Sequence, residues 1–340
     1  MLTSTNITKR ATICFLVFLG FSSISGLSDA QDYASENWGE WNAVAPEIFP
    51  GTTWMKYQSP EEAGWSSEKL AKARHWFDEA DSAALMVIYN GAVLLQWGDT
   101  QRRYKNHSVR KSLLSALYGN AVGTGEIRLD ATLDSLGIND DLPLTETEKT
   151  ATVSDLLKSR SGIYIPAAYE SRSMAESRPE RGSNKPGEYW YYNNWDFNVL
   201  GSIYRQQTST DVFEAFDHLI ARPLQMQDYE QRHGYYHLEA WHSRHPAYPF
   251  RMSARDLARF GYLYLKQGRW ADQQVIPKAW VAQSTKAYSY EYSTGYGYMW
   301  WTIKENTTLG RLGTYWAAGY GGQWIYVIPA ANLVVVHRAD

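Results

Sequence analysis

Residues 108–121, SVRKSLLSALYGNA, are the most informative part of this sequence. Apolar residues recur at every fourth position from Val109, and glycines follow at 123 and 125, which predicts a helix. Lys111 lies one helical turn after Ser108 on the same face, so its amine can reach the serine hydroxyl. A serine hydroxyl is a poor nucleophile without a base in hydrogen-bond reach, so this pair is predicted to be nucleophile and base. The Ser108 backbone N–H, at the helix start, can also stabilise an oxyanion.

The same Ser-x-x-Lys spacing occurs earlier, at Ser66-Ser67-Glu68-Lys69. A motif this short arises by chance about once in a chain of this composition, so its context must decide between the two. A serine at 66 or 67 is expected to cap a helix that runs to about Ala80. The earlier pair therefore has a structural explanation, with its lysine in solvent.

Composition limits the possible classes of function. The 340 residues are 44% apolar and carry a net charge of −3. This balance allows a sizeable core and argues against nucleic-acid binding and polybasic membrane attachment. We expect no cofactor.

The first thirty residues are predicted to be a secretory signal peptide. Lys9 and Arg10 precede an apolar run over 11–19, and small residues lead to Ala30, where cleavage is expected. The apolar run is far shorter than the roughly 20 residues of a membrane span, so no stable membrane insertion is expected after cleavage. The protein is expected to be exported, periplasmic or secreted. The only cysteine, Cys14, would be removed, leaving no disulfide and no Cys-based metal site.

The order of the predicted elements indicates an α/β (α+β) fold. An irregular lead-in over 31–60 is followed by a hairpin, whose apolar runs 83–89 and 92–97 flank Asn90-Gly91. Helical and loop-like sequence follows, and strands return near the end. The predicted helices after the first are 153–159, 211–224 and 253–267, and the predicted late strands are 296–303, 323–328 and 333–337. Both chain ends would thus build one antiparallel sheet flanked by helices, with a mostly helical lobe over about 108–246 inserted between them.

A second motif follows in residues 186–195, PGEYWYYNNW. A tyrosine hydroxyl is a suitable partner for a shared lysine proton. With Ser108 and Lys111 upstream, the chain resembles serine hydrolases related to class C β-lactamases. That family also holds penicillin-binding-type peptidases, β-lactamase-like carboxylesterases and 6-aminohexanoate-dimer hydrolases. The resemblance implies a β-lactamase/transpeptidase-like fold over 61–340.

The family pattern is Tyr-x-Asn followed by Leu-Gly, and two registers fit it, starting at Tyr191 or Tyr192. The spacing to Leu200-Gly201 favours the second. The resemblance then implies Tyr192 as the partner of the base and Asn194 as a contact to the substrate carbonyl.

The third family motif is Lys-Thr-Gly, or His/Trp-x-Gly in esterase-like branches, on a strand beside the site. Residues 319–323, GYGGQ, take its place here. The resemblance implies that Tyr320, Gly322 and Gln323 line the substrate side, with the Gln323 N–H as second oxyanion donor. Tyr320 carries no cation, which argues against recognition of a substrate carboxylate. Arg110 is expected to face outward and so not to replace that cation.

Further stretches resemble the same family. Residues 152–162 resemble its T-x-x-x-LL…SG loop, and residues 252–261 resemble a capped helix. Residues 223–226 resemble its PLGM turn, except that Gln225 replaces the glycine. The family usually closes with a helix on the sheet, whereas the sequence ends at Asp340, just past a predicted strand. Two explanations remain open: the chain is a fragment, or the face of the sheet is covered in another way.

Four neighbouring histidines offer an alternative, a metal site. Zinc could be held by His233 and His237 if they were helical, with His242, His245 or Glu239 nearby. The residues between them do not favour a helix, and no H-E-x-x-H motif occurs, so polar loop histidines and no metal are the preferred interpretation. No G-x-S-x-G motif occurs either, which argues against a Ser-His-Asp hydrolase.

The sequence therefore predicts an exported serine hydrolase that forms an acyl-enzyme with a small-molecule ester or amide. Esters and uncharged amides are expected to be preferred. A β-lactamase or D-alanyl-D-alanine carboxypeptidase is the alternative within the family. A non-catalytic sensor of cell-wall fragments on the same scaffold is the alternative of another class.

Overall fold

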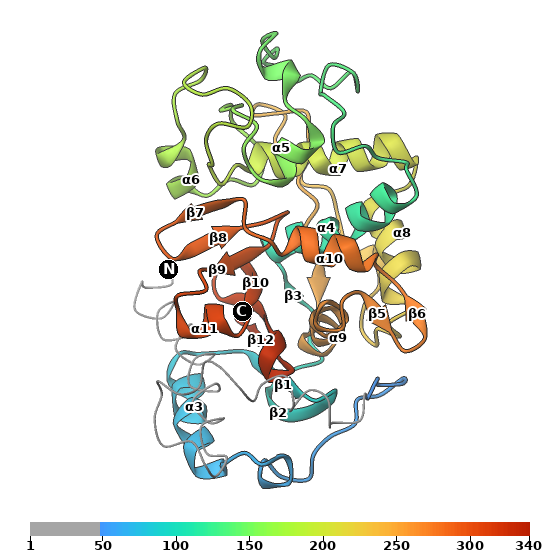
Figure 1. Ribbon diagram of the computed structural model, residues 1–340, viewed down its shortest axis with the longest axis vertical. Coiled ribbons are helices and arrows are strands. Elements are labelled where there is room, and N and C mark those ends of the chain that lie inside the picture. The colour runs from blue at the N-terminus through green and yellow to red at the C-terminus, as the bar shows by residue number, and fades with distance from the viewer. Residues whose placement is uncertain (1–47) are drawn as a thin grey trace.

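The computed structural model describes residues 48–340. The predicted signal peptide and Cys14 lie outside the described residues, as does most of the predicted lead-in. A central sheet has helices against both of its faces (Figure 1). The strands are β1 (Ala84–Tyr89), β2 (Ala92–Gly98), β3 (Tyr104–Lys105), β4 (Arg251–Met252), β5 (Arg269–Trp270), β6 (Gln273–Gln274), β7 (Ser289–Glu291), β8 (Thr294–Tyr296), β9 (Trp301–Ile303), β10 (Tyr315–Gly319), β11 (Gln323–Ile328) and β12 (Leu333–Arg338).

The helices include short 3-10 turns and one π-helical turn, η5. In chain order they are η3 (Glu61–Ala63), α3 (Ser67–Glu79), α4 (Val109–Gly123), η4 (Glu148–Thr150), α5 (Val153–Leu157), α6 (Arg172–Ser177), α7 (Asn194–Thr208), α8 (Val212–Phe216), η5 (Asp217–Ala221), η6 (Gln231–His233), α9 (Ala254–Leu265), α10 (Lys278–Ser284), α11 (Thr308–Arg311) and η7 (Pro329–Ala331). None of the helices within 48–340 has the length and apolar run needed to cross a membrane.

The main sheet has eight strands in the order β2-β1-β12-β11-β10-β9-β8-β7. Every neighbouring pair in it is antiparallel. Early strand β1 pairs with the last strand, β12, so segments from both ends of the chain lie side by side in the sheet (Figure 1). This arrangement confirms the predicted antiparallel sheet built from both ends.

The β1–β2 hairpin forms where the sequence predicts it. Asn90 and Gly91 have φ angles of +50° and +84°, the left-handed backbone that a two-residue hairpin turn of type I′ requires. A Cβ atom at position 91 would lie 2.3 Å from the Ile48 carbonyl oxygen, so only glycine fits there.

Side chains of β1 alternate between two apolar clusters. Met86 and Ile88 belong to the larger cluster, which includes α4 and α9. Leu85 and Val87 point the other way, into a cluster with α3. Because both faces are covered, the strand is a continuous apolar run instead of an alternating one.

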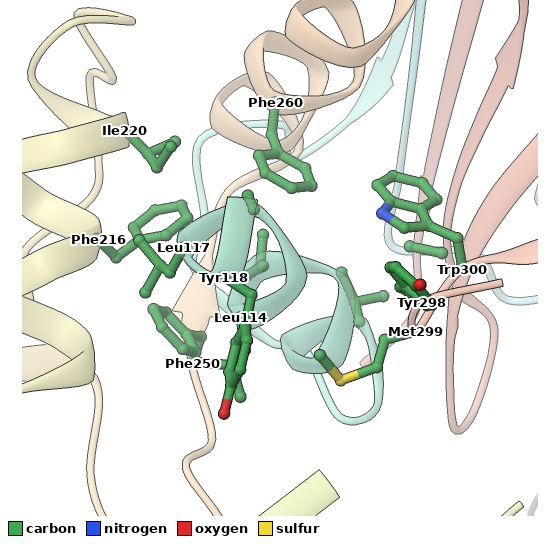
Figure 2. Packing of buried hydrophobic residues seen from close by; sticks show 14 of the residues in the cluster. Leu114, Leu117, Tyr118, Phe216, Ile220, Phe250, Phe260, Tyr298, Met299 and Trp300 are labelled. Atoms are coloured by element: carbon green, nitrogen blue, oxygen red, sulfur yellow. The ribbon is translucent and has the colours of Figure 1, made fainter. Parts of the chain in front are cut away.

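Helix α4 is buried on nearly all sides, although its pattern predicted one apolar face. Figure 2 shows its residues Leu114, Leu117 and Tyr118 among side chains from other segments. These neighbours include Phe216, Ile220, Phe250, Phe260, Tyr298, Met299 and Trp300. The inserted helical segment covers the side of α4 that the sheet leaves open, which fixes the position of the Ser-x-x-Lys pair.

The strand predicted over 296–303 is wrong as a single element. Strand β8 ends at Tyr296 and β9 begins at Trp301. Between them, Ser115 Oγ and Ser112 Oγ donate to the carbonyl oxygens of Tyr298 and Met299, each at 2.7 Å. The loop bends toward α4 to make these contacts, and Met299 takes a φ of +61°.

Candidate active site

The start of α4 places the predicted nucleophile beside the predicted base. Ser108 is the N-cap residue of α4, and Lys111 lies one turn along. Lys111 Nζ is 3.0 Å from Ser108 Oγ and 2.8 Å from the Tyr192 hydroxyl. Only 1% of Lys111 is exposed. One buried amine therefore bridges a serine hydroxyl and a phenol.

Burial acts on both titratable members of this cluster. It lowers the pKa of Lys111 well below its usual value, and the positive charge of Arg110 lowers it further. Burial also raises the pKa of Tyr192 to about 12, against the opposite effects of its hydrogen bond to Ser108 and of Arg110. Both shifts favour an amine and a phenol without charge. A neutral amine can accept the serine proton, which an ammonium cannot.

The structure brings Tyr192, and not Tyr191, to the lysine. The Tyr191 hydroxyl instead donates to the Met174 carbonyl oxygen at 2.6 Å. Asn193 caps α7 by accepting a hydrogen bond from the Trp195 N–H. The Tyr192 ring lies against the rings of Phe197 and Trp301. The register starting at Tyr192 is therefore the one in which tyrosine and lysine meet.

Asn194 lies at the wall of the same cavity. Its Nδ2 donates to the Tyr169 carbonyl oxygen at 2.5 Å. Its Oδ1 is buried and has no hydrogen-bond partner within 48–340. Asn194 thus binds the Tyr169 backbone through Nδ2, while its Oδ1 is left as an unpaired hydrogen-bond acceptor.

The cavity above Ser108 has a volume of about 640 Å³. Strand β10 contributes Ala318 and Gly319 to its wall, and Tyr320 follows them. A Cβ atom on Gly319 would lie 2.4 Å from the Asn106 carbonyl oxygen, so glycine lets β10 approach the residues before Ser108.

Gly322 and Gln323 are not among the residues that line this cavity, so their role on the substrate side stays a prediction. The chain turns after Tyr320, and Gln323 lies opposite Gly319 in β11. Gln323 Nε2 donates to the Ala339 carbonyl oxygen at 2.6 Å, and the Gly322 carbonyl oxygen contacts His337 Nδ1 at the same distance. Both residues therefore bind the C-terminal strand region instead of the cavity.

Two cavity residues, His107 and Tyr169, were not predicted as site residues. Their φ angles are +48° and +67°, which are uncommon for residues with large side chains. His107 Nδ1 lies 3.1 Å from the Tyr169 hydroxyl, and the two rings are stacked. Burial, followed by the charges of Lys105 and Arg338, lowers the pKa of His107 to about 4. The only signal in the sequence was that His107 precedes Ser108, while Tyr169 belongs to no motif.

Arg110 faces inward, contrary to expectation. It is fully buried, and its Nη2 donates to Asn198 Oδ1 at 2.9 Å. Its guanidinium carbon lies 4.3 Å from the centre of the Tyr248 ring. Because α4 is covered on nearly all sides, no outward position was open to this side chain.

The cavity wall does contain two cations, Lys105 and Arg172, although none comes from β10. Arg172 pairs with Glu176 at 2.7 Å. The Lys105 ammonium lies 4.8 Å from the centre of the Tyr169 ring and 6.0 Å from that of Tyr235. Its pKa is raised, since favourable contacts with these two tyrosines outweigh the opposing effect of burial.

The earlier Ser-x-x-Lys pair has the structural role that its context predicted. Ser66 is the N-cap of α3, and its side chain accepts a hydrogen bond from the Lys69 N–H. The capping interpretation is confirmed.

Three of the four histidines contact protein groups through their rings, whereas the buried Nδ1 of His233 has no hydrogen-bond partner within 48–340. His237 Nε2 and His242 Nδ1 each lie 2.9 Å from a carboxylate oxygen of Glu239. His245 contacts Ser202 Oγ and the Asn139 carbonyl oxygen, while His233 ends the 3-10 turn η6. Across 48–340, no cluster of three or more His, Cys, Asp or Glu side chains is arranged to hold a metal ion.

Comparisons with known proteins give one family match and many structural matches. The model of the Beta-lactamase family matches residues 70–337. An uncharacterised protein of Alkalihalophilus pseudofirmus is 23% identical over 302 residues, which cover 76% of this chain and 83% of that protein.

Solved structures share the fold at low identity. One from Bacillus anthracis, described as a "putative 6-aminohexanoate-dimer hydrolase", has a TM-score of 0.61 and 17% identity, covering 100% of this chain and 92% of that one. A penicillin binding protein from Bacillus halodurans has a TM-score of 0.59 and 15% identity, covering 77% and 93%. A class C β-lactamase has a TM-score of 0.58 and 14% identity, covering 78% and 89%. These matches confirm the resemblance and the fold class expected from the sequence.

Proposed function

Because this chain belongs to the beta-lactamase family of hydrolases, we propose that it hydrolyses ester or amide bonds through an acyl-enzyme at Ser108. The observation that carries this proposal is the buried Lys111 amine, within 3.0 Å of Ser108 Oγ and 2.8 Å of the Tyr192 hydroxyl. This arrangement supplies an activated nucleophile and a route for its proton.

The proposed reaction begins with attack of Ser108 Oγ on the substrate carbonyl carbon, while its proton moves to Lys111 Nζ. The negative charge on the carbonyl oxygen is stabilised by the Ser108 N–H at the start of α4. Collapse of the intermediate breaks the bond to the leaving oxygen or nitrogen, which takes a proton through Tyr192 and Lys111. Water then attacks the acyl-enzyme by the same proton route and releases the acid.

The second oxyanion donor is proposed to be the Tyr320 N–H. This group follows Gly319 at the cavity wall, where Gln323 was expected to act. Gly319 allows β10 to approach the segment that leads into Ser108, because a Cβ atom at this position would lie only 2.4 Å from the Asn106 carbonyl oxygen. Two N–H donors, one from α4 and one after β10, would then flank the reacting carbonyl.

The substrates are proposed to be esters or uncharged amides, in preference to β-lactams and D-Ala-D-Ala peptides. Those latter substrates carry a carboxylate, which calls for a cation or a strong donor cluster near the scissile bond. The end of β10 offers Ala318, Gly319 and Tyr320 there. The Lys105 ammonium lies instead over the Tyr169 ring.

Export to the periplasm or medium is likewise a proposal. It rests on the charged, apolar and small-residue pattern of residues 1–30 alone. The N-terminal sequence of the protein recovered from the periplasmic fraction of an expressing bacterium checks it. Cleavage near Ala30 is the expected result, and an intact N-terminus in the cytosol would contradict export.

The test of the proposed function is the variant Ser108→Ala. It should abolish hydrolysis of p-nitrophenyl butyrate and covalent labelling by a fluorophosphonate, because no nucleophile remains. Ser66→Ala is the matched control, since Ser66 only caps α3, and it should keep both. Hydrolysis that survives in Ser108→Ala disproves the assignment. Labelling of Ser108 without turnover of any ester would favour a sensor.

A further inference from the structure

The Arg110 guanidinium lies wholly inside the protein, one residue before the proposed base. It makes one hydrogen bond, from Nη2 to Asn198 Oδ1 at 2.9 Å, and it lies over the Tyr248 ring. Its Nε and Nη1 atoms are buried without a hydrogen-bond partner in the described part of the chain. Buried guanidinium groups are normally paired with carboxylates, and this one is not.

No carboxylate pairs with Arg110 among residues 48–340: none of the ion pairs there includes it. The one acid on α7 is Asp196, which accepts hydrogen bonds from Ser161 Oγ and Asn193 Nδ2. Burial raises the pKa of Asp196 well above its usual value, which favours its neutral form.

The buried phenols next to the cluster do not supply negative charge either. The phenol of Tyr296 on β8 faces Tyr192, and Tyr248 lies beneath Arg110. Burial raises the pKa values of both phenols, so both stay neutral. On the cavity side, Lys105 and Arg172 add positive charge, and His107 is neutral above about pH 4. The two carboxylates of the cavity wall have other partners: Glu170 pairs with Arg178, and Glu239 contacts His237 and His242. The Arg110 charge therefore acts on Lys111 without a carboxylate paired to Arg110 itself.

Resting on the function proposed above, we propose that Arg110 is a positioning residue whose fixed positive charge keeps Lys111 in the neutral form that can accept the Ser108 proton. A like charge in a poorly solvated site disfavours protonation of a neighbouring amine. The same charge lowers the pKa of Tyr192, so it favours the deprotonated forms of both Lys111 and Tyr192. The hydrogen bond to Asn198 and the Tyr248 ring hold the guanidinium in place.

The test is the pH profile of kcat/KM for p-nitrophenyl butyrate in Arg110→Met and Arg110→Lys. Activity on the acid side requires the deprotonated pair, so it falls below the apparent pKa of that pair. Arg110→Met removes the charge. The acid limb of the profile, the range in which kcat/KM rises with pH, should then move up by about one pH unit. At a given pH on that limb, activity should be about tenfold lower. The loss should shrink as the pH rises. Arg110→Lys keeps a positive charge and should restore the native limb.

Arg259→Met is the matched control. Arg259 on α9 is also fully buried, and its guanidinium donates to the carbonyl oxygens of Leu224 and Gly51, outside the cavity. Its loss should lower the melting temperature without moving the acid limb. An Arg110→Met profile that is scaled down equally at every pH would mean a merely structural role and would overturn the proposal.

The unsubstituted enzyme gives a second measurement if Arg110→Met does not fold. Its acid limb must lie well below the ordinary lysine pKa of about 10.4. An acid limb at that value would overturn the proposal without any variant. The outcome for Ser108→Ala separates a failure of the proposed function from a failure of the role of Arg110. If that variant is inactive while the acid limb fails to move, only the role of Arg110 is wrong.

Discussion

Tyr320 is the residue on which the expected substrate preference depends. Its side chain is 63% exposed at the edge of the cavity, with its ring 5.8 Å from that of His107. It can stack or donate one hydrogen bond, but it carries no charge to hold a carboxylate. A charge-assisted hydrogen bond contributes about 1.5–3 kcal/mol, so its absence matters for anionic substrates.

We expect kcat/KM for p-nitrophenyl butyrate to exceed that for nitrocefin, by roughly ten- to a hundredfold on this ground. Both are measured on one preparation, with Ser108→Ala as the blank for uncatalysed hydrolysis. Nitrocefin turnover at or above the ester rate would place the protein with the β-lactamases. It would also point to Lys105 or Arg172 as the group that holds the carboxylate, since both cations line the same cavity.

At the scale of elements, the site depends on how closely β10 approaches the loop before α4. The Asn106 N–H donates to the Phe250 carbonyl oxygen at 2.9 Å, and the Asn106 carbonyl oxygen accepts from the Val109 N–H at 3.1 Å. This carbonyl therefore cannot move without disturbing the first turn of α4. It is also the atom nearest to a Cβ on Gly319.

Gly319→Ala should accordingly reduce activity by pushing β10 away from Ser108. Overpacking of this kind costs about 1–3 kcal/mol of stability. Part of this strain should also displace the site and reduce kcat at least tenfold. Gly51→Ala is the control, since a Cβ there meets nothing within 4 Å. Unchanged kcat in Gly319→Ala would show that the spacing between β10 and α4 is not required. The measurements are kcat, KM and the melting temperature.

Local patterns predicted local structure well. The β1–β2 hairpin, α4 and the cap of α9 at Ser253 all follow from residues close in sequence. The break between β8 and β9 was missed because serines of α4 bind the carbonyl groups of that loop. Such contacts join residues more than 180 positions apart, and no period in the sequence reports them.

In the candidate site as well, local spacing predicted some positions, and contacts distant in sequence decided the others. Ser108, Lys111 and Tyr192 follow motif spacing, and the structure brings them together. The inward turn of Arg110 depends on helices that cover α4 from elsewhere in the chain. The role of Gln323 was assigned by its place in the stretch that stands for the Lys-Thr-Gly motif, and the turn after Tyr320 takes this residue into β11.

At the scale of the whole molecule, the C-terminal strand holds the segment that leads into the nucleophile. Arg338 at the end of β12 is fully buried. Its Nη2 donates to the Tyr104 carbonyl oxygen at 3.0 Å and to Asn106 Oδ1 at 2.8 Å. The last described strand and the approach to α4 are therefore one connected unit, although more than 230 residues separate them.

Arg338→Met should lower both stability and kcat, because Asn106 Oδ1 and the Tyr104 carbonyl oxygen, both just before Ser108, lose the donor that Arg338 supplies. Each unsatisfied buried group costs about 1–3 kcal/mol. Arg102→Met is the control from the same region: Arg102 pairs with Asp340 at 2.8 Å, but both side chains are more than half exposed, and such pairs contribute about 0–1 kcal/mol. Melting temperature and kcat for p-nitrophenyl butyrate check both variants. If Arg338→Met loses stability but keeps kcat at a temperature where it is folded, β12 supports the fold without positioning Ser108.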